Sequence, residues 1–78
     1  MSGEKTSSYS WKRQMSGKEI AALLKENNWE FVNSEGSHHH YRKNKIKVTI
    51  PIHGNRSIAI GTLHNIKRMV NFAESQTK

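Results

Sequence analysis

The sequence contains no cysteine and no aspartate, and proline occurs once among its 78 residues. Without cysteine the chain has no disulfide framework, no thiol nucleophile and no cysteine-bound zinc. Without aspartate, Ser/His/Asp catalysis and paired-aspartate chemistry are excluded. No run approaches the roughly 18 apolar residues of a spanning helix, and the start lacks the apolar stretch of a signal peptide. We therefore expect a cytoplasmic protein with no membrane contact.

Positive charge, by contrast, is abundant and unevenly distributed. Thirteen Lys and Arg face six acidic residues, all of them Glu, which gives a formal net charge of +7. Residues 1–35 are balanced, and residues 36–78 carry the whole excess, with Glu74 as their single acid. Such a surface attracts a polyanion, and RNA or DNA is the expected one. A general solubilising excess of charge is the alternative.

The apolar pattern predicts one small domain of the α+β class. Ser16 and Glu19 have the spacing of a capping box before a first helix, which Asn27 and Asn28 end. Alternation predicts three strands, and Thr62 is expected to cap a second helix. The order α-β-β-β-α predicts a three-stranded antiparallel sheet with two helices on one face, the order of the double-stranded-RNA-binding domain. The predicted ranges are a disordered leader or cloning remnant 1–14, the domain 15–74, strands 29–34, 38–42 and 45–51, and a C-terminal tail 75–78.

Strand parity divides the run of three histidines. If Tyr41 points to the core, His39 leans the same way, whereas His38, His40 and Arg42 face outward. On the next strand the outward residues are Lys45, Lys47 and Thr49. Imidazoles among cations on an open sheet predict a phosphate-binding surface that contains a proton-transfer group. A solvated polar face without a role is the alternative.

A metal site at the histidines is disfavoured because Lys and Arg surround them, and positive charge opposes cation binding. We expect neither a metal nor a small-molecule cofactor. Acid–base catalysis by histidine then remains, on a substrate that brings its own nucleophile. RNA does so, because its 2′-hydroxyl attacks the adjacent phosphate once a base removes the proton.

Four segments resemble the HicA toxins of bacterial and archaeal toxin–antitoxin pairs, in consistent order over roughly residues 15–72. Gly36-Ser37-His38-His39-His40-Tyr41 is similar to the family's Gly-Ser-His-His-x-aromatic signature. The others are Asn28-Trp29-Glu30-Phe31-Val32, Val48-Thr49-Ile50-Pro51-Ile52-His53 and Gly61-Thr62-Leu63-His64-Asn65-Ile66. The sequence departs from the family in the basic turn Lys43-Asn44-Lys45, in the loop at Asn55-Arg56-Ser57, and in Asn28, which replaces the usual Gly.

The resemblance implies a ribosome-independent, metal-free endoribonuclease that cleaves mRNA, with a HicB-like antitoxin as the partner that covers its active histidine. His38 is the position that carries over as catalytic, as general base toward the 2′-hydroxyl. The general acid stays open between water, His40 and a lysine. The alternatives are a non-catalytic RNA-binding module of the same fold and a protein that only engages an antitoxin-like partner to tune repression. The predicted RNA-binding residues are His40, Arg42, Lys43, Lys45, Lys47 and Arg56.

Overall fold

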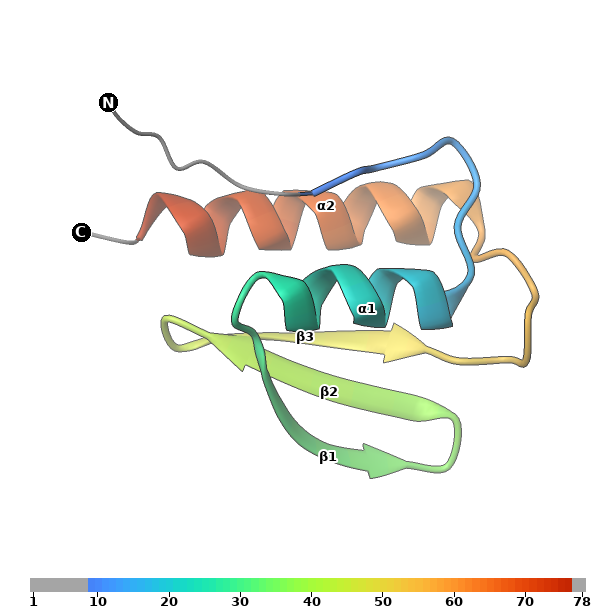
Figure 1. Cartoon of the computed structure of the whole chain (residues 1–78), viewed down its shortest axis with the longest axis horizontal. Coiled ribbons are helices and arrows are strands. Elements are labelled where there is room, and N and C mark those ends of the chain that lie inside the picture. The colour runs from blue at the N-terminus through green and yellow to red at the C-terminus, as the bar shows by residue number, and fades with distance from the viewer. Residues whose placement is uncertain (1–8, 77–78) are drawn as a thin grey trace.

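The computed structural model describes residues 9–76 (Figure 1). In chain order this range forms α1 (Gly17–Glu26), β1 (Glu30–Glu35), β2 (His38–Lys43), β3 (Ile46–Pro51) and α2 (Ile60–Ser75). The strands make one antiparallel sheet in the order β1-β2-β3, and both helices lie on the same face of it (Figure 1). The predicted α-β-β-β-α fold of the α+β class is confirmed. Neither described helix combines the length and the apolar character needed to cross a membrane.

The predicted limits of α1 are confirmed by its caps. The Ser16 hydroxyl accepts from the Glu19 backbone N–H at 3.2 Å, and the Glu19 carboxylate accepts from the Ser16 N–H at 2.9 Å. This backbone N–H, with the ammonium of Lys12, holds the pKa of the Glu19 carboxyl below its ordinary value. The helix ends at Asn27, and Asn28 takes a left-handed backbone with φ 71°. The capping box and the asparagine stop therefore set the helix.

Two tight turns join the strands, and the second one changes the expected role of Lys45. Asn44 and Lys45 have φ values of 52° and 71°. Two successive left-handed residues form the turn type that matches the twist of a two-residue hairpin. Strand β3 consequently begins at Ile46, and Lys45 is a turn residue rather than the first residue of the strand.

The start of α2 also differs from the prediction. The helix begins at Ile60 with Ala59 at the N-cap, so Thr62 lies inside the first turn and does not cap it. The Leu63 N–H already donates to the Ala59 carbonyl at 2.9 Å. Because Ala59 has no side-chain acceptor, no side chain caps the first backbone N–H groups of the helix.

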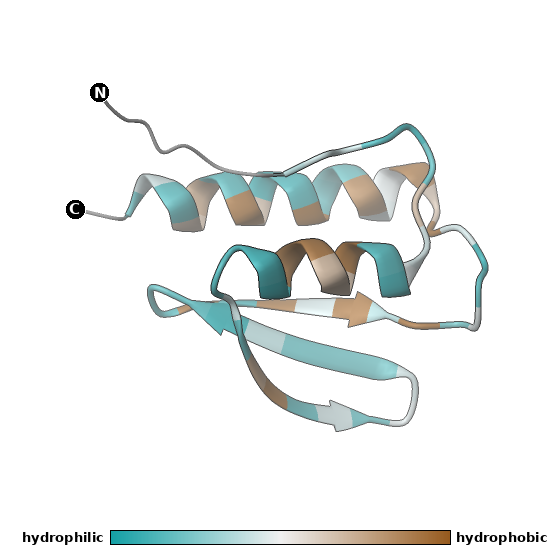
Figure 2. Cartoon of the chain, viewed as in Figure 1, coloured by the Kyte–Doolittle hydropathy of each residue, from teal (hydrophilic) through white to brown (hydrophobic). Residues whose placement is uncertain are grey.

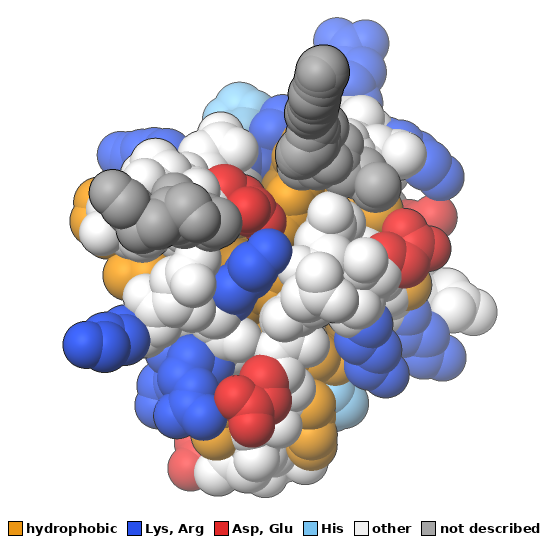
Figure 3. Space-filling view, turned by 60° about the vertical axis from the view of Figure 1, so that its left-hand side comes forward, with side chains coloured by type: hydrophobic (Ala, Val, Ile, Leu, Met, Phe, Trp, Pro, Cys, Tyr) orange, Lys and Arg blue, Asp and Glu red, His pale blue; other side chains and the backbone are white. Residues whose placement is uncertain are grey.

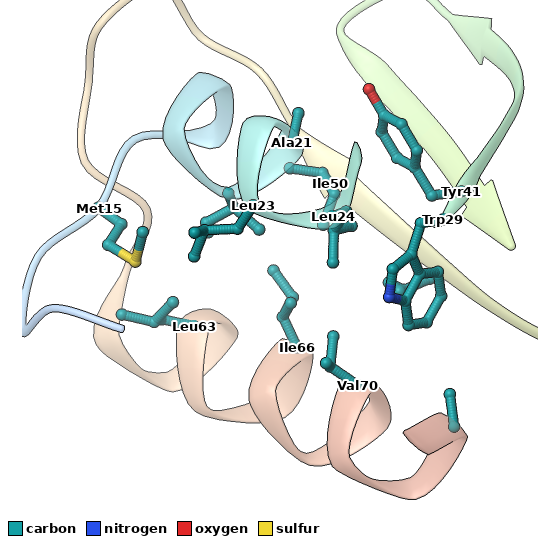
Figure 4. Packing of buried hydrophobic residues seen from close by; sticks show 13 residues of the cluster. Met15, Ala21, Leu23, Leu24, Trp29, Tyr41, Ile50, Leu63, Ile66 and Val70 are labelled. Carbon is teal, nitrogen blue, oxygen red and sulfur yellow. The ribbon is translucent and has the colours of Figure 1, made fainter. Parts of the chain in front are cut away.

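The core fills the space between the two helices and β3. Leu23 and Leu24 of α1 lie opposite Leu63, Ile66 and Val70 of α2 (Figure 4). Burying an aliphatic side chain of this size stabilises the fold by roughly 1.5–3 kcal/mol. Figure 2 places the hydrophobic residues on the inner sides of the helices and at alternate positions of β3, whereas β2 is hydrophilic along its length.

Strand β1 extends beyond the cover of the helices, and every one of its residues is exposed. Phe31, although strongly hydrophobic, is 49% exposed. Its ring meets the edges of His39 and Tyr41 at centroid distances of 5.9 and 5.5 Å. Trp29, one residue before the strand, is buried as predicted.

Residues 9–14 lie against α2, although the sequence predicted the folded domain to start at residue 15. The Tyr9 hydroxyl donates to the Glu74 carboxylate at 2.6 Å and accepts from the Trp29 indole N–H at 2.8 Å. Trp11 stacks on Tyr9 with ring centroids 5.7 Å apart, and the Lys67 ammonium lies 5.6 Å from the Trp11 ring. The remainder of the predicted leader, residues 1–8, and residues 77–78 of the predicted tail fall outside the described residues.

Candidate functional site

The face of the sheet that the helices leave uncovered, here called the open face, is set by the strand register. His40 pairs with Thr49, Arg42 pairs with Lys47, and Tyr41 pairs with Val48. Tyr41 and Val48 are buried beneath the helices, so their neighbours along each strand point to the other side. The predicted outward orientation of His38, His40, Arg42, Lys47 and Thr49 follows from this register.

The three histidines of β2 have three different surroundings. His39 points to the helix side, where it lines a shallow groove with Ala21 and Tyr41 and contacts the Phe31 ring. His40 is held by hydrogen bonds on the open face. His38 is exposed, and within residues 9–76 its ring makes no hydrogen bond or ion pair. Of the three, His38 alone lies exposed on the open face with both ring nitrogens free of hydrogen bonds to the described residues.

Both ring nitrogens of His40 are engaged. Nδ1 lies 2.9 Å from the Thr49 hydroxyl, and Nε2 lies 3.3 Å from a Glu35 carboxylate oxygen. A carboxylate only accepts, so Nε2 carries a proton and donates to Glu35. The side chain is 15% exposed. His40 therefore braces β1, β2 and β3 together beside His38.

Glu35 is a site residue that the sequence analysis missed. It pairs with His38 across the β1–β2 ladder, and its carboxylate reaches His40. The short turn at Gly36, where φ is 60°, places these two residues opposite each other. The sequence signal that could have found Glu35 is its position immediately before the Gly36 turn, which sets it opposite His38.

The open face is less positive than the sequence suggested. The Arg42 guanidinium donates to the Glu30 carboxylate at 2.9 Å. Thus Arg42 and Lys47 are matched by Glu30 and Glu35 on the same face. At the end of the molecule that carries the β2–β3 turn, Figure 3 likewise shows Lys and Arg spread among carboxylates rather than gathered in one patch. Counted over Arg42, Lys47, Glu30 and Glu35, the open face has local ion pairs and no net charge.

The remaining predicted RNA-binding residues are not gathered on this face. The Lys43 ammonium lies on the helix side, where it donates to the Asn27 carbonyl at 2.7 Å and to Glu74 at 2.8 Å. Lys45 is exposed in the β2–β3 turn, at the end of β2 opposite to His38. Arg56 is exposed in the loop after β3, at the same end of the molecule as His38. The structure joins His38, His40, Arg42 and Lys47, and separates Lys43 from them.

The histidines and glutamates of the described range do not form a metal site. Among residues 9–76, no three His, Cys, Asp or Glu side chains come together in a group that would hold a metal ion. His53 lies in the exposed loop that follows β3.

The molecule is thus a small α-β-β-β-α domain whose open sheet presents one unpartnered histidine. Residues 17–71 match the family described as the HicA toxin of bacterial toxin–antitoxin systems, and the chain belongs to that family. Membership confirms the resemblance of the four segments and implies a partner antitoxin. No match is found among curated proteins or among solved structures.

Proposed function

We propose that this toxin is a metal-free endoribonuclease that cleaves mRNA in the cytoplasm, independently of the ribosome, with His38 as the general base. The observation that carries the proposal is the difference between the three histidines of β2. His39 is turned to the helices and His40 is bonded at both nitrogens, whereas His38 is exposed without a partner. An exposed imidazole on an open sheet is accessible to a polymer as large as RNA.

The chemistry needs only groups that the protein and RNA supply. His38 removes the proton of a ribose 2′-hydroxyl, and the resulting oxygen attacks the adjacent phosphorus. The bond to the 5′-oxygen breaks, which leaves a 2′,3′-cyclic phosphate on one fragment. The 5′-oxygen takes its proton from water or from a lysine, since both nitrogens of His40 are already bonded. General-base catalysis of this kind contributes roughly 100- to 10,000-fold in rate.

Cations on the open face and in the loop after β3 position the RNA. Lys47 is exposed on the open face, and Arg42 is held by an exposed ion pair that a phosphate can replace at little cost. Arg42 and Lys47 lie toward the β2–β3 turn, and Arg56, in the loop beyond β3, adds a cation at the His38 end. In this proposal Lys43 serves the fold, because Asn27 and Glu74 hold its ammonium. A HicB-like antitoxin inhibits the enzyme by covering His38.

The test compares two histidines of the same run. His38→Gln is expected to lower the rate of RNA cleavage about 100-fold or more, while His39→Gln retains most of it, both with unchanged circular dichroism. Cleavage by the wild type should persist in EDTA and produce 2′,3′-cyclic or 3′-phosphate ends. Loss of cleavage on chelation with recovery on Zn²⁺ or Mg²⁺ addition would replace the proposal with a metal mechanism. RNA binding without cleavage by the wild type would identify a binding module instead.

A further inference from the structure

The positive charge that the open face lacks is found at another place on the molecule. On the open face Arg42 is paired with Glu30, and the Glu35 carboxylate, which contacts His40, balances the charge of Lys47 in number. Arg13 and Arg56, by contrast, are exposed and make no ion pair with any residue in the 9–76 range. Lys67 contacts the face of Trp11 and likewise has no carboxylate partner among these residues.

Arg13 and Lys67 line a groove between residues 11–14 and the first turns of α2, here called the arm groove. Two adjoining hollows form it and share Lys12, Arg13 and Ile60 as lining residues. No carboxylate lines either hollow among the described residues. Glu19 comes near only through its ion pair with Lys12, at 3.2 Å. The arm groove is therefore cationic.

The arm groove also offers what a nucleic acid strand binds besides charge. Half-buried Trp11 and Ile60, which is 57% exposed, line it together with the cations, so it carries aromatic and apolar surface as well as charge. Single-stranded nucleic acids bind surfaces of this mixed kind. The uncapped backbone N–H groups at the start of α2 favour an anion at the same place. An acidic protein is the other occupant that such a surface accepts, and the experiment below distinguishes it from RNA.

The arm groove lies at the same end of the molecule as His38. β2 begins, β3 ends and α2 begins at the same end of the molecule (Figure 1). The loop 52–59 connects the two places. Its Ile52 N–H donates to the Ser37 carbonyl beside His38 at 2.7 Å, and its Ile58 N–H donates to the Met15 carbonyl at 2.8 Å. Ser57 of this loop lines the arm groove, next to Arg56.

We propose that the arm groove is a second RNA-binding surface, which holds the backbone of the RNA that His38 cleaves. The RNA runs from His38 past Arg56 into the groove, where Arg13 and Lys67 contact its phosphates. This inference rests on the proposed function for its substrate, and it assigns binding to residues before Met15 that the sequence placed outside the domain.

The experiment uses the full chain with His38→Gln, so that a short fluorescent single-stranded RNA is bound but not cut. Its dissociation constant is measured by anisotropy over a series of salt concentrations. Each lost phosphate contact lowers the salt slope by about 0.7. Arg13→Gln with Lys67→Gln should therefore lower it by about 1.4. The matched control, Lys18→Gln with Lys25→Gln, removes the same charge from the β2-facing side of α1 and should leave the slope unchanged.

A single Arg13→Gln variant keeps the test independent of Trp11 packing, and it should lower the slope by about 0.7. In the His38-containing enzyme the double variant should raise KM with kcat unchanged. Equal slopes for the groove pair and the α1 pair would overturn the proposal. So would unchanged RNA affinity with weakened antitoxin binding, which would make the groove a protein interface. Failure of the proposed function gives a different result: the wild-type protein, with His38 present, would then not cleave RNA, whatever the salt slopes of the groove variants.

Discussion

Tyr9 connects the start of the described chain to its core. Its hydroxyl donates to Glu74 and accepts from the indole of buried Trp29. Burial and then the hydrogen bond to Glu74 raise the pKa of the Tyr9 phenol well above its ordinary value. The folded protein therefore favours the neutral phenol, and the hydrogen bond from Tyr9 to Glu74 exists only while Tyr9 keeps its proton.

This linkage predicts a pH dependence of stability. A raised pKa in the folded state means that the stabilisation is complete below the unfolded value of about 10 and is lost as pH rises above it. Tyr9→Phe should remove this part of the decline between about pH 9 and pH 11. Melting temperatures of both proteins over that range provide the measurement. Parallel curves for the two proteins would show that Tyr9 does not carry the effect.

For the three histidines of β2, the sequence predicted which side of the sheet each one faces but not which ones are hydrogen-bonded. Strand alternation separated His39 from His38 and His40, because parity depends on β2 alone. It could not separate His38 from His40. That difference depends on cross-strand partners, Thr49 and Glu35, and the β1 register shifts at a bulge after Phe31. A bulge moves every later pair, and its position is not visible in the residue types.

At the scale of elements, the start of α1 is fixed by a close approach to the end of β3. Gly17 is buried, and a Cβ at this position would collide with the Pro51 carbonyl oxygen and lie 3.1 Å from the Ile52 Cα. Both obstacles are backbone, so neither can rotate away. Pro51 pairs with His38 in the sheet. The absence of a side chain at Gly17 thus allows α1 to support the strand end that carries the site.

Two glycine-to-alanine changes separate this contact from helix propensity. Alanine is the better helix former by up to ~1 kcal/mol. Gly17→Ala should nevertheless lower the free energy of unfolding by about 1–3 kcal/mol, because overpacking against backbone outweighs propensity. Gly61→Ala, in the first turn of α2 with open space around it, should raise the free energy of unfolding by about 0.5–1 kcal/mol. Urea denaturation measures both, and a gain at both positions would contradict the packing argument.

Element prediction succeeded where side chains alternate and failed where they do not. In β3 the burial alternates as its residue types do, with Val48 and Ile50 inward. In β1 all six residues are exposed, so Phe31 could not be placed from its hydrophobicity. Thr62 suggested the wrong helix start because the helical hydrogen bonds begin earlier, with the Leu63 N–H donating to the Ala59 carbonyl, although Ala59 offers no capping side chain.

The whole molecule has two ends of different character. One end holds His38, the loop 52–59 and the arm groove (Figure 1). The other holds the β2–β3 turn and the Lys43–Glu74 ion pair, with charges of both signs on its surface (Figure 3). Charge counted along the sequence missed this arrangement. Glu30 and Glu35 belong to the balanced half of the chain, but β1–β2 pairing brings them onto the open face.

This arrangement predicts how the antitoxin binds. If a HicB-like partner inhibits by covering His38, then His38→Gln should abolish toxicity and leave the affinity for the partner nearly unchanged, because one imidazole is a small part of such an interface. Lys47→Glu should slow association, since a charge at an interface rim acts mainly on the association rate. Lys25→Glu, on α1, is the control of equal charge change.

Surface plasmon resonance at physiological salt distinguishes the arrangements. A partner that binds only the folded toxin should also raise its melting temperature. At a free partner concentration of a hundred times Kd, the free energy of unfolding should rise by about 2.7 kcal/mol. Slower association for Lys47→Glu but not for Lys25→Glu places the partner on the open face. The reverse result places it on the α1 side of the sheet, where His38 stays open. The toxin would then have to be inhibited from a distance, and direct masking of His38 would be wrong.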